Sequence, residues 1–282
     1  MSTEPSSRPS SFPINELLLR TTSAVVLVTA TLAMTWSGPI PFAVLAGAVA
    51  LVLLWEWGRL TTGQGFTPVR VCAGACILAA LGFTIAGRAG TALLLVGAGA
   101  AVGALMSGRA DPRTEIGGVL YAGLPAVALL WFRSAPNHGL EAIVFLFLVV
   151  WATDTGAFIA GRAIGGPRLW ARVSPNKTWS GLTGGVVAAS VCAWVYVSWL
   201  GGRPGIALIA VAAVLAVVSQ GGDLFESALK RAYGVKDASS LIPGHGGFMD
   251  RVDGLVFAAV AAAAFVAMVD PAQPGSALIG LR

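Results

Sequence analysis

The chain has 282 residues, of which 56% are hydrophobic and 11% are charged, and it carries a net charge of +5. Soluble domains carry about 25% charged residues, so this composition excludes an ordinary soluble protein and predicts that lipid surrounds most of the chain. The basic residues are scattered between apolar runs, which argues against a nucleic-acid partner. The three cysteines lie inside apolar segments, which argues against a disulfide framework or a zinc site.

Residues 1–16 are rich in Ser and Pro and predict a flexible tail without the apolar core of a signal peptide. A helix needs about 20 residues to cross a hydrocarbon core, and nine apolar runs approach that length. They lie at 17–36, 38–57, 69–87, 89–107, 117–132, 140–161, 181–200, 204–223 and 254–270. Because lipid permits only helices or closed barrels, the runs predict an all-α, polytopic integral membrane protein with about nine transmembrane helices. Five would lie in an N-terminal unit, 17–132, and four in a C-terminal unit, 140–282.

The distribution of positive charge predicts the orientation, because Lys and Arg concentrate on the cytoplasmic side of membrane proteins. If the N-terminus is cytoplasmic, fourteen of the eighteen Lys and Arg residues fall on inner segments. The two long polar loops, 162–180 and 224–253, then also face the cytoplasm.

Two groups of glycines occur at spacings that let helices approach closely in lipid. They are Gly97, Gly99 and Gly103, and Gly181, Gly184 and Gly185. We interpret both groups as packing positions rather than as phosphate-binding loops.

Asp154 is an ionisable residue within an apolar run, next to Thr153 and Thr155. Such residues are costly in a membrane and usually face a polar cavity, so Asp154 is a candidate for substrate binding. The alternative is a structural carboxylate held by hydrogen bonds or an ion pair.

The segment SPNKTWSG begins at Ser174 and precedes the run at 181–200. Pro175 and Asn176 are expected to form a turn, and Lys177 stands just before the span. A lysine and hydroxyl groups, such as that of Thr178, at a helix entrance could hold phosphate oxygens, because the free N–H groups there already favour anions. The alternative is a positively charged anchor, with Thr178 or a nearby hydroxyl capping the helix.

Polar residues follow the run at 204–223. If that helix continues beyond the membrane, Asp223, Ser227 and either Lys230 or Arg231 share one face. The stripe offers a carboxylate, a hydroxyl group and a cation.

The next segment, 236–254, is rich in glycine and charge. Gly246 and Gly247 allow the backbone to approach a ligand closely, with His245 held beside them. Asp250 and Asp253 would share a face where the ninth span begins.

Carboxylates mixed with basic residues, without usable thiols, suit Mg²⁺ and a phosphate-bearing substrate better than zinc. Asp223 and Asp250 lie at opposite ends of one polar excursion and are the candidate metal ligands, in a site that could hold two metal ions. This pattern indicates phosphoryl or nucleotidyl transfer. The candidates for binding phosphate groups are Lys230, Arg231, Lys236 and Arg251. The alternative is a solvated basic loop that binds anionic lipid headgroups.

The same residues resemble the signature of the phosphatidate cytidylyltransferases. The matching positions are Ser227, Lys230, Arg231, Lys236, Asp237, Ser239, Ile242, Pro243, His245, Gly246, Gly247, Asp250, Arg251 and Asp253. The segments DTGAFIAGR and SPNKTWSG resemble two further family segments, so the resemblance covers the chain from about residue 150 onward. One departure is Ser180, where the family commonly has Glu, which puts in doubt a carboxylate role at that position.

The resemblance implies a Mg²⁺-dependent enzyme that converts phosphatidate and CTP into CDP-diacylglycerol and pyrophosphate, in a catalytic C-terminal unit of a multi-pass cytoplasmic-membrane homodimer. It implies that Asp223 and Asp250 hold a metal pair whose second ion is divalent or monovalent. The expected catalytic residues are Asp223, Asp250, Lys230, Arg231, Lys236, His245 and Arg251. The expected substrate-binding residues are Asp154, Ser174, Asn176, Lys177, Thr178, Ser227, Asp237, Gly246, Gly247 and Asp253.

Three alternatives stay open on the sequence. The first is another CTP-using enzyme of membrane lipids, such as a cytidylyltransferase for ether lipids or a polyprenol kinase. The second is a transporter or channel whose acidic residues bind a coupling cation. The third is a lipid-binding scaffold without enzymatic activity.

Overall fold

The computed structural model describes residues 14–108, 111–239, 241–242 and 246–281. Residues 1–13 of the predicted tail 1–16, together with Pro243 and His245, therefore lie outside the described residues, whereas residues 14–16 belong to the first helix rather than to a tail. The long helices are α1 (Ile14–Trp36), α2 (Pro39–Thr62), α3 (Pro68–Ile85), α4 (Ala89–Leu105), α5 (Pro112–Arg133), α6 (Gly139–Ile164), α7 (Trp179–Trp199), α8 (Ile206–Ala232) and α9 (Met249–Val269). Each predicted apolar run falls on one of them, in the predicted order.

Seven helices in the described part of the chain are long and apolar enough to cross a membrane. They are α2, α3 and α5 to α9, whereas Thr21–Trp36 of α1 and the whole of α4 are shorter apolar helices. The predicted class, a helical polytopic membrane protein, is therefore confirmed.

The predicted loop 162–180 contains a β-hairpin, which the all-α prediction lacked. Strand β1 (Arg168–Trp170) pairs antiparallel with β2 (Ser174–Thr178). The turn expected at Pro175 and Asn176 is wrong, because both residues lie in β2 and the chain reverses just before it, where Val173 N–H donates to the Trp170 carbonyl. Proline can occupy β2 because both strands of a hairpin are edge strands. The short helix α10 (Pro274–Ile279) was also not predicted.

Helix α8 continues beyond the apolar run to Ala232, as expected for a helix that carries the stripe of Asp223, Ser227 and Lys230. Helix α9 begins at Met249, earlier than the apolar run at 254–270, and therefore includes Asp250 and Asp253. A hydropathy pattern detects only the apolar stretch of a helix. Polar residues continue α8 beyond the C-terminal end of its apolar run and begin α9 before its apolar run starts.

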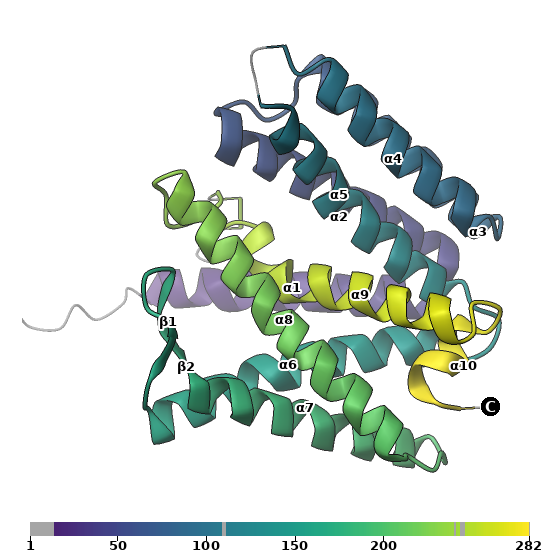
Figure 1. Ribbon diagram of the computed structural model, residues 1–282, viewed down its shortest axis with the longest axis vertical. Helices are drawn as coiled ribbons and strands as arrows, with labels where there is room; N and C mark the ends of the chain where they lie inside the picture. Colours follow the sequence, from purple (N-terminus) through teal and green to yellow (C-terminus); the bar gives the residue numbers. More distant parts are fainter. Residues whose placement is uncertain (1–13, 109–110, 240, 243–245, 282) are drawn as a thin grey trace, which may run out of the picture.

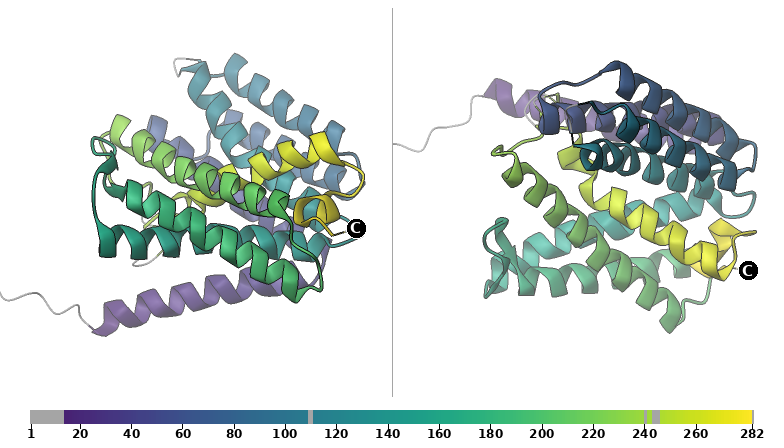
Figure 2. Two further views of the ribbon diagram at one scale, coloured as in Figure 1. Left: turned by 60° about the horizontal axis from the view of Figure 1, so that its bottom comes forward. Right: turned by 45° about the horizontal axis from the view of Figure 1, so that its top comes forward.

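The helices form two groups with α9 between them (Figure 1). Helices α2 to α5 pack together on one side, α6 to α8 lie on the other, and α9 contacts α5, α6 and α8. The two further views show α1 along the outside of the bundle, where it contacts α2 and α6 (Figure 2).

The loops meet in two sets at opposite ends of the helices. At one end, Trp57 Nε1 donates to the carbonyl of Thr114 over 2.9 Å, between the end of α2 and the start of α5. At the other end, Asn137 Nδ2 donates to Gln273 Oε1 over 2.9 Å. Both pairs join segments that the charge distribution places on the same side of the membrane.

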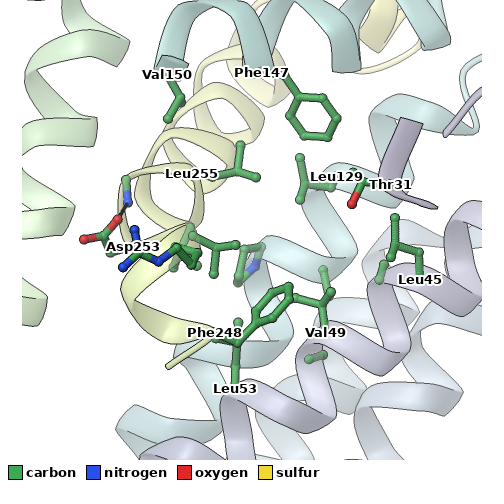
Figure 3. A pocket seen from close by; sticks show the side chains of 18 of the residues that line it. Thr31, Leu45, Val49, Leu53, Leu129, Phe147, Val150, Phe248, Asp253 and Leu255 are labelled. Carbon is green, nitrogen blue, oxygen red and sulfur yellow. Dashed lines mark hydrogen bonds between the residues drawn. The ribbon is translucent and has the colours of Figure 1, made fainter. Parts of the chain in front are cut away.

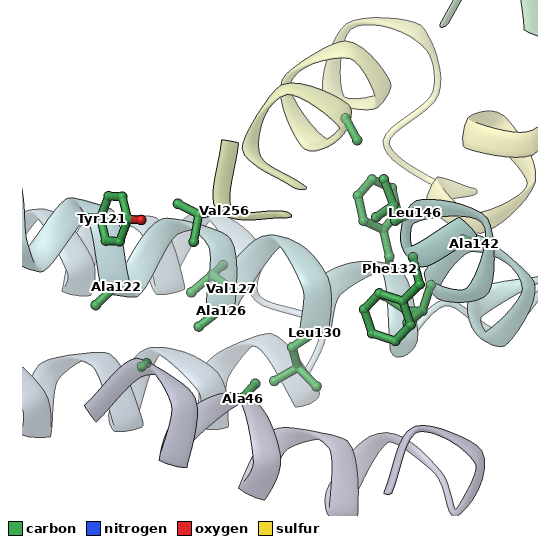
Figure 4. Packing of buried hydrophobic residues seen from close by; sticks show 14 of the residues in the cluster. Ala46, Tyr121, Ala122, Ala126, Val127, Leu130, Phe132, Ala142, Leu146 and Val256 are labelled. Atoms are coloured by element: carbon green, nitrogen blue, oxygen red, sulfur yellow. The ribbon is translucent and has the colours of Figure 1, made fainter. Parts of the chain in front are cut away.

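The group α2 to α5 and the group α6 to α8 are held together by the packing of small and medium side chains. Such packing is needed because the hydrophobic effect does not drive helices to associate in lipid. Helix α5 lies between α2 and α9, with Tyr121, Ala126 and Leu130 among the buried residues between Ala46 and Val256 (Figure 4). Leu130 is 0% exposed, so the contact is closely packed.

A buried ion pair joins α3 to α5. Arg70 is 1% exposed, and its Nε and Nη2 donate to the two oxygens of Glu115 over 3.1 and 2.5 Å. Its Nη1 donates to the carbonyls of Gln64 and Gly65 over 2.5 and 3.0 Å. The partners of this guanidinium replace the water that it lost, which allows a charge to remain buried.

The predicted glycines of α7 are packing positions, and so is Gly156 of α6, which was not predicted. A Cβ on Gly184 would lie 2.2 Å from Cβ of Ala160, and one on Gly156 would lie 2.5 Å from Cβ of Ala188. Gly97 was expected to pack in the same way, but a Cβ there would meet no atom within 4 Å. That expectation is wrong, because Gly97 faces open space.

Gly184→Leu should therefore destabilise the bundle by about 1–3 kcal/mol or more, because overpacking forces α6 and α7 apart. Gly97→Leu is the matched control and should change stability by less than about 0.5 kcal/mol. Thermal unfolding of the detergent-solubilised variants measures both. Equal melting temperatures for the two variants would contradict the close α6–α7 contact.

Candidate active site

The hairpin places Lys177 against α8. Strand β2 runs directly into α7, where Thr178 is the N-cap residue and its Oγ1 accepts from Gly181 N–H over 3.0 Å. Lys177 Nζ lies 2.6 Å from Oδ2 of Asp223, and both side chains are only partly exposed. The capping role of Thr178, one of the predicted alternatives, is confirmed.

Gln220 joins this pair to Asp154. Its side-chain Nε2 donates to Oδ1 of Asp154 over 3.4 Å, and its Oε1 accepts from Lys177 Nζ over 3.3 Å. Gln220 was not among the predicted site residues. The available signal was an amide within an apolar run, three residues before Asp223.

A polar pocket of about 300 Å³ opens beside these residues. Six of the predicted substrate-binding or metal-binding residues line it, contributed by α6, β2 and α8. They are Asp154, Ser174, Asn176, Lys177, Thr178 and Asp223. Segments far apart in the sequence are thus brought to one site.

An apolar cavity of about 240 Å³ lies between α1, α2, α5, α6 and α9. Asp253 lies at one edge of the side chains around it, whereas Leu45, Leu129 and Phe147 lie away from that edge (Figure 3). Arg251 also lines the cavity.

Asp154 lines both the polar pocket and the apolar cavity, so the two spaces adjoin at its side chain. The carboxylate of Asp253 interacts electrostatically with Asp223, Asp154 and Lys177. Three carboxylates and one lysine therefore gather where the two spaces meet.

A second charged cluster lies nearer the start of α9. Lys230 Nζ is 2.5 Å from Oδ1 of Asp250 and 2.6 Å from Oε2 of Glu226, and all three side chains are at most 12% exposed. Glu226 was missed by the sequence analysis, although it stands one residue before the matched Ser227.

Asp250 also holds the glycine-rich loop. Its Oδ2 accepts from Gly247 N–H over 2.9 Å and from Ala238 N–H over 3.3 Å. A Cβ on Gly247 would lie 3.0 Å from that oxygen, and Gly246 has a φ of 81°, in the left-handed region. Both glycines are needed for the loop's own geometry.

The structure pairs Asp223 and Asp250 with different lysines, Lys177 and Lys230. Ser227 Oγ donates to Oδ1 of Asp223 over 3.4 Å. Within the described ranges, no three His, Cys, Asp or Glu side chains are arranged to hold a metal ion. A cation shared by Asp223 and Asp250 stays a prediction.

The remaining predicted residues lie at the protein surface. Arg231, Lys236, Asp237 and Arg251 are exposed. Asp237 lines a pocket together with Arg59 and Trp55, separate from the pocket at Lys177. Ser180 Oγ donates to the carbonyl of Gly165, where it supports the chain between α6 and α7.

The fold and the charged site define a polytopic membrane protein with a polar pocket and an apolar cavity that adjoin at one end of the helix bundle. The family model described as "Cytidylyltransferase family" matches residues 18–269. This chain belongs to that family.

Proteins named phosphatidate cytidylyltransferase are similar to this chain, two of the three given below over most of their length. The one from Brucella suis is 40% identical over 249 residues, which cover 87% of this chain and 92% of the relative. The one from Haemophilus influenzae is 34% identical over 277 residues, covering 85% and 94%. The one from Bacillus subtilis is 41% identical over 140 residues, covering 49% and 52%.

Lys230→Met should destabilise the protein by about 3–5 kcal/mol, because Glu226 and Asp250 would remain buried without their cation. Arg231→Met is the adjacent control. Its side chain is exposed and donates to the carbonyl of Val235, so its loss should cost less than about 0.5 kcal/mol. Thermal unfolding in detergent compares the two, and a similar loss from both would contradict a structural role specific to Lys230.

Proposed function

We propose that this chain is a phosphatidate cytidylyltransferase, which transfers CMP from CTP to phosphatidate and forms CDP-diacylglycerol and pyrophosphate. The observation that carries the proposal is the junction at Asp154 between a polar pocket and an apolar cavity. A reaction between a nucleotide and a lipid needs two such spaces in contact. The family and the names of the relatives support the same conclusion.

The apolar cavity is suited to the part of phosphatidate next to its headgroup. Pockets that enclose drug-sized ligands usually measure about 300–1,000 Å³, and this cavity measures about 240 Å³. It therefore takes only part of the lipid, and the ends of the acyl chains stay in the bilayer. Arg251, which lines the cavity, is positioned to attract the phosphate of the headgroup.

The polar pocket is suited to the phosphates of CTP. Lys177 supplies a positive charge, and the hydroxyls of Ser174 and Thr178 can donate hydrogen bonds. The N-terminus of α7 also opens beside Thr178, where the helix dipole favours an anion.

The donor set fits Mg²⁺, because the carboxylates at the junction supply oxygen ligands and the three cysteines are on α3 and α7. We propose that Asp223 and Asp250 hold Mg²⁺. Each carboxylate would then contact the metal ion in place of its lysine. The site would also hold a second ion, either divalent or monovalent. When bound, Mg²⁺ would neutralise charge on the phosphates of the transferring group.

In the proposed reaction, an oxygen of the phosphatidate phosphate attacks the α-phosphorus of CTP. The new bond joins the lipid phosphate to CMP, the bond between the α- and β-phosphates breaks, and pyrophosphate leaves. A phosphate monoester is already ionised near neutral pH, so the site needs no strong base to activate it. The protein's part is to position both substrates and to compensate their charge, which Lys177 does in the polar pocket and Arg251 does in the apolar cavity.

We place the site at the cytoplasmic face of the cell membrane, because the loops around it carry most of the Lys and Arg residues. In this arrangement all nine long helices span the membrane and the N-terminus is cytoplasmic. A homodimer is the assembly that the family resemblance suggests.

Purified protein in phosphatidate-containing micelles should transfer the label of CTP marked at the α-phosphorus into lipid and should release pyrophosphate. A lipid kinase would leave that label in CDP. A transporter would leave CTP intact, so retention of all label in CTP, with phosphatidate and Mg²⁺ present, would exclude the proposal.

Asp223→Asn and Lys177→Met should each lower turnover by at least about 100-fold, because each removes a charge whose contribution to the transition state is several kcal/mol. Asp111→Asn is the matched control. Asp111 is the exposed N-cap of α5 and lines none of the pockets described above, and Asn caps a helix equally well. Pyrophosphate release per folded protein measures the effects. Near-normal turnover of either site variant would remove that residue from the site.

A further inference from the structure

Glu56 lies on α2, far in sequence from the candidate active site, yet it contacts the loop before α9 and the start of that helix. Its side chain is fully buried, at 0% exposure. Oε1 accepts from Ser239 Oγ over 2.5 Å and from Phe248 N–H over 2.8 Å. Oε2 accepts from Met249 N–H over 2.6 Å.

These contacts replace the usual helix cap. The first N–H groups of a helix have no partner within the helix, and a short polar side chain at the N-cap normally satisfies one of them. The N-cap residue of α9 is Phe248, whose side chain has no hydrogen-bonding group. Glu56 provides the acceptors from another helix, and its negative charge also favours the positive end of the α9 dipole.

We propose that Glu56 is a positioning residue for cytidylyl transfer, which sets the start of α9 and thereby the positions of Asp250 and Asp253. This inference rests on the proposed function. Asp250 follows Met249 directly, and Asp253 lies one turn later on the same helix. A shift at the capped N–H groups therefore moves both carboxylates.

The geometry leaves little freedom at this contact. A Cβ on Gly247 would lie 2.9 Å from Oε1 of Glu56, so the loop fits closely over the carboxylate. Both oxygens act as acceptors, and an amide offers an acceptor on one side only. In Glu56→Gln, the side-chain NH₂ group must therefore face at least one of the backbone N–H donors. Two donor groups repel each other, so the start of α9 moves away from the side chain.

Glu115 supplies the matched control. It is also a buried carboxylate of the N-terminal helices, but it binds Arg70 rather than the loop. Glu115→Gln should lower the stability and leave the turnover of folded protein within about twofold of the original chain, because, among the described residues, neither Glu115 nor Arg70 contacts the loop before α9 or lines the two spaces that meet at Asp154. Glu56→Gln should change turnover itself.

The test measures kcat and KM for the full-length protein in micelles, together with amide hydrogen exchange of residues 246–253. We expect Glu56→Gln to lower kcat by about 10- to 100-fold, because misplacement of reacting groups by about 1 Å costs that much, with KM for CTP changed less than about threefold. Amide exchange in 246–253 should accelerate, whereas Glu115→Gln should leave it unchanged. Equal effects of the two variants on kcat and on exchange would overturn the proposal.

Ser239→Ala tests the same contact without disturbing the charge. It should lower kcat less than Glu56→Gln does, and the double variant should be no worse than Glu56→Gln alone, because Ser239 acts through Glu56. If the decreases in kcat of the two single variants add up in the double variant, the proposal is overturned. If Glu56→Gln does not fold, Ser239→Ala alone provides the test, and unchanged kcat and unchanged amide exchange in that variant would overturn the proposal. Exchange is measured without substrate, so a failure of the proposed reaction leaves this part of the result interpretable.

Discussion

A charge in an apolar helix bundle must have a partner, and this requirement shapes the end of the bundle where the site lies. Arg70 is satisfied by Glu115 and by backbone carbonyls, which makes it a permanent part of the structure. Lys177 and Asp223 form a more exposed pair beside the polar pocket. The first pair is buried, at 1% and 7% side-chain exposure, whereas the second borders a pocket that a ligand could enter.

The ion pairs of Lys177 with Asp223 and of Lys230 with Asp250 have a second effect. Breaking a buried pair leaves an uncompensated charge, so the lysines hold the carboxylates in position while no substrate is present. The carboxylate of Asp223 is thus held by Lys177 and that of Asp250 by Lys230. Any shared cation has to compete with both lysines.

Much of the fold could be predicted from hydropathy, because a run of about 20 apolar residues has few alternatives to a helix in lipid. Asp154, Lys177 and Asp223 could each be selected as candidates, since a charge is costly in or beside a span, but their convergence on one pocket was not predicted from that cost. Which helices pair could not be predicted, and so the contact of Glu56 with the start of α9 was missed: nothing in the WEWGR segment indicates its partner. The turn at Pro175 was wrong because local propensity did not reveal the pairing of Trp170 with Ser174.

Asp154 lines both the polar pocket proposed for the nucleotide and the apolar cavity proposed for the lipid. Neither substrate then needs to leave its own phase, because one diffuses in water and the other in the plane of the bilayer. The supply of the lipid is two-dimensional, so its mole fraction in the membrane, rather than its amount per volume of solution, sets how often the site is filled.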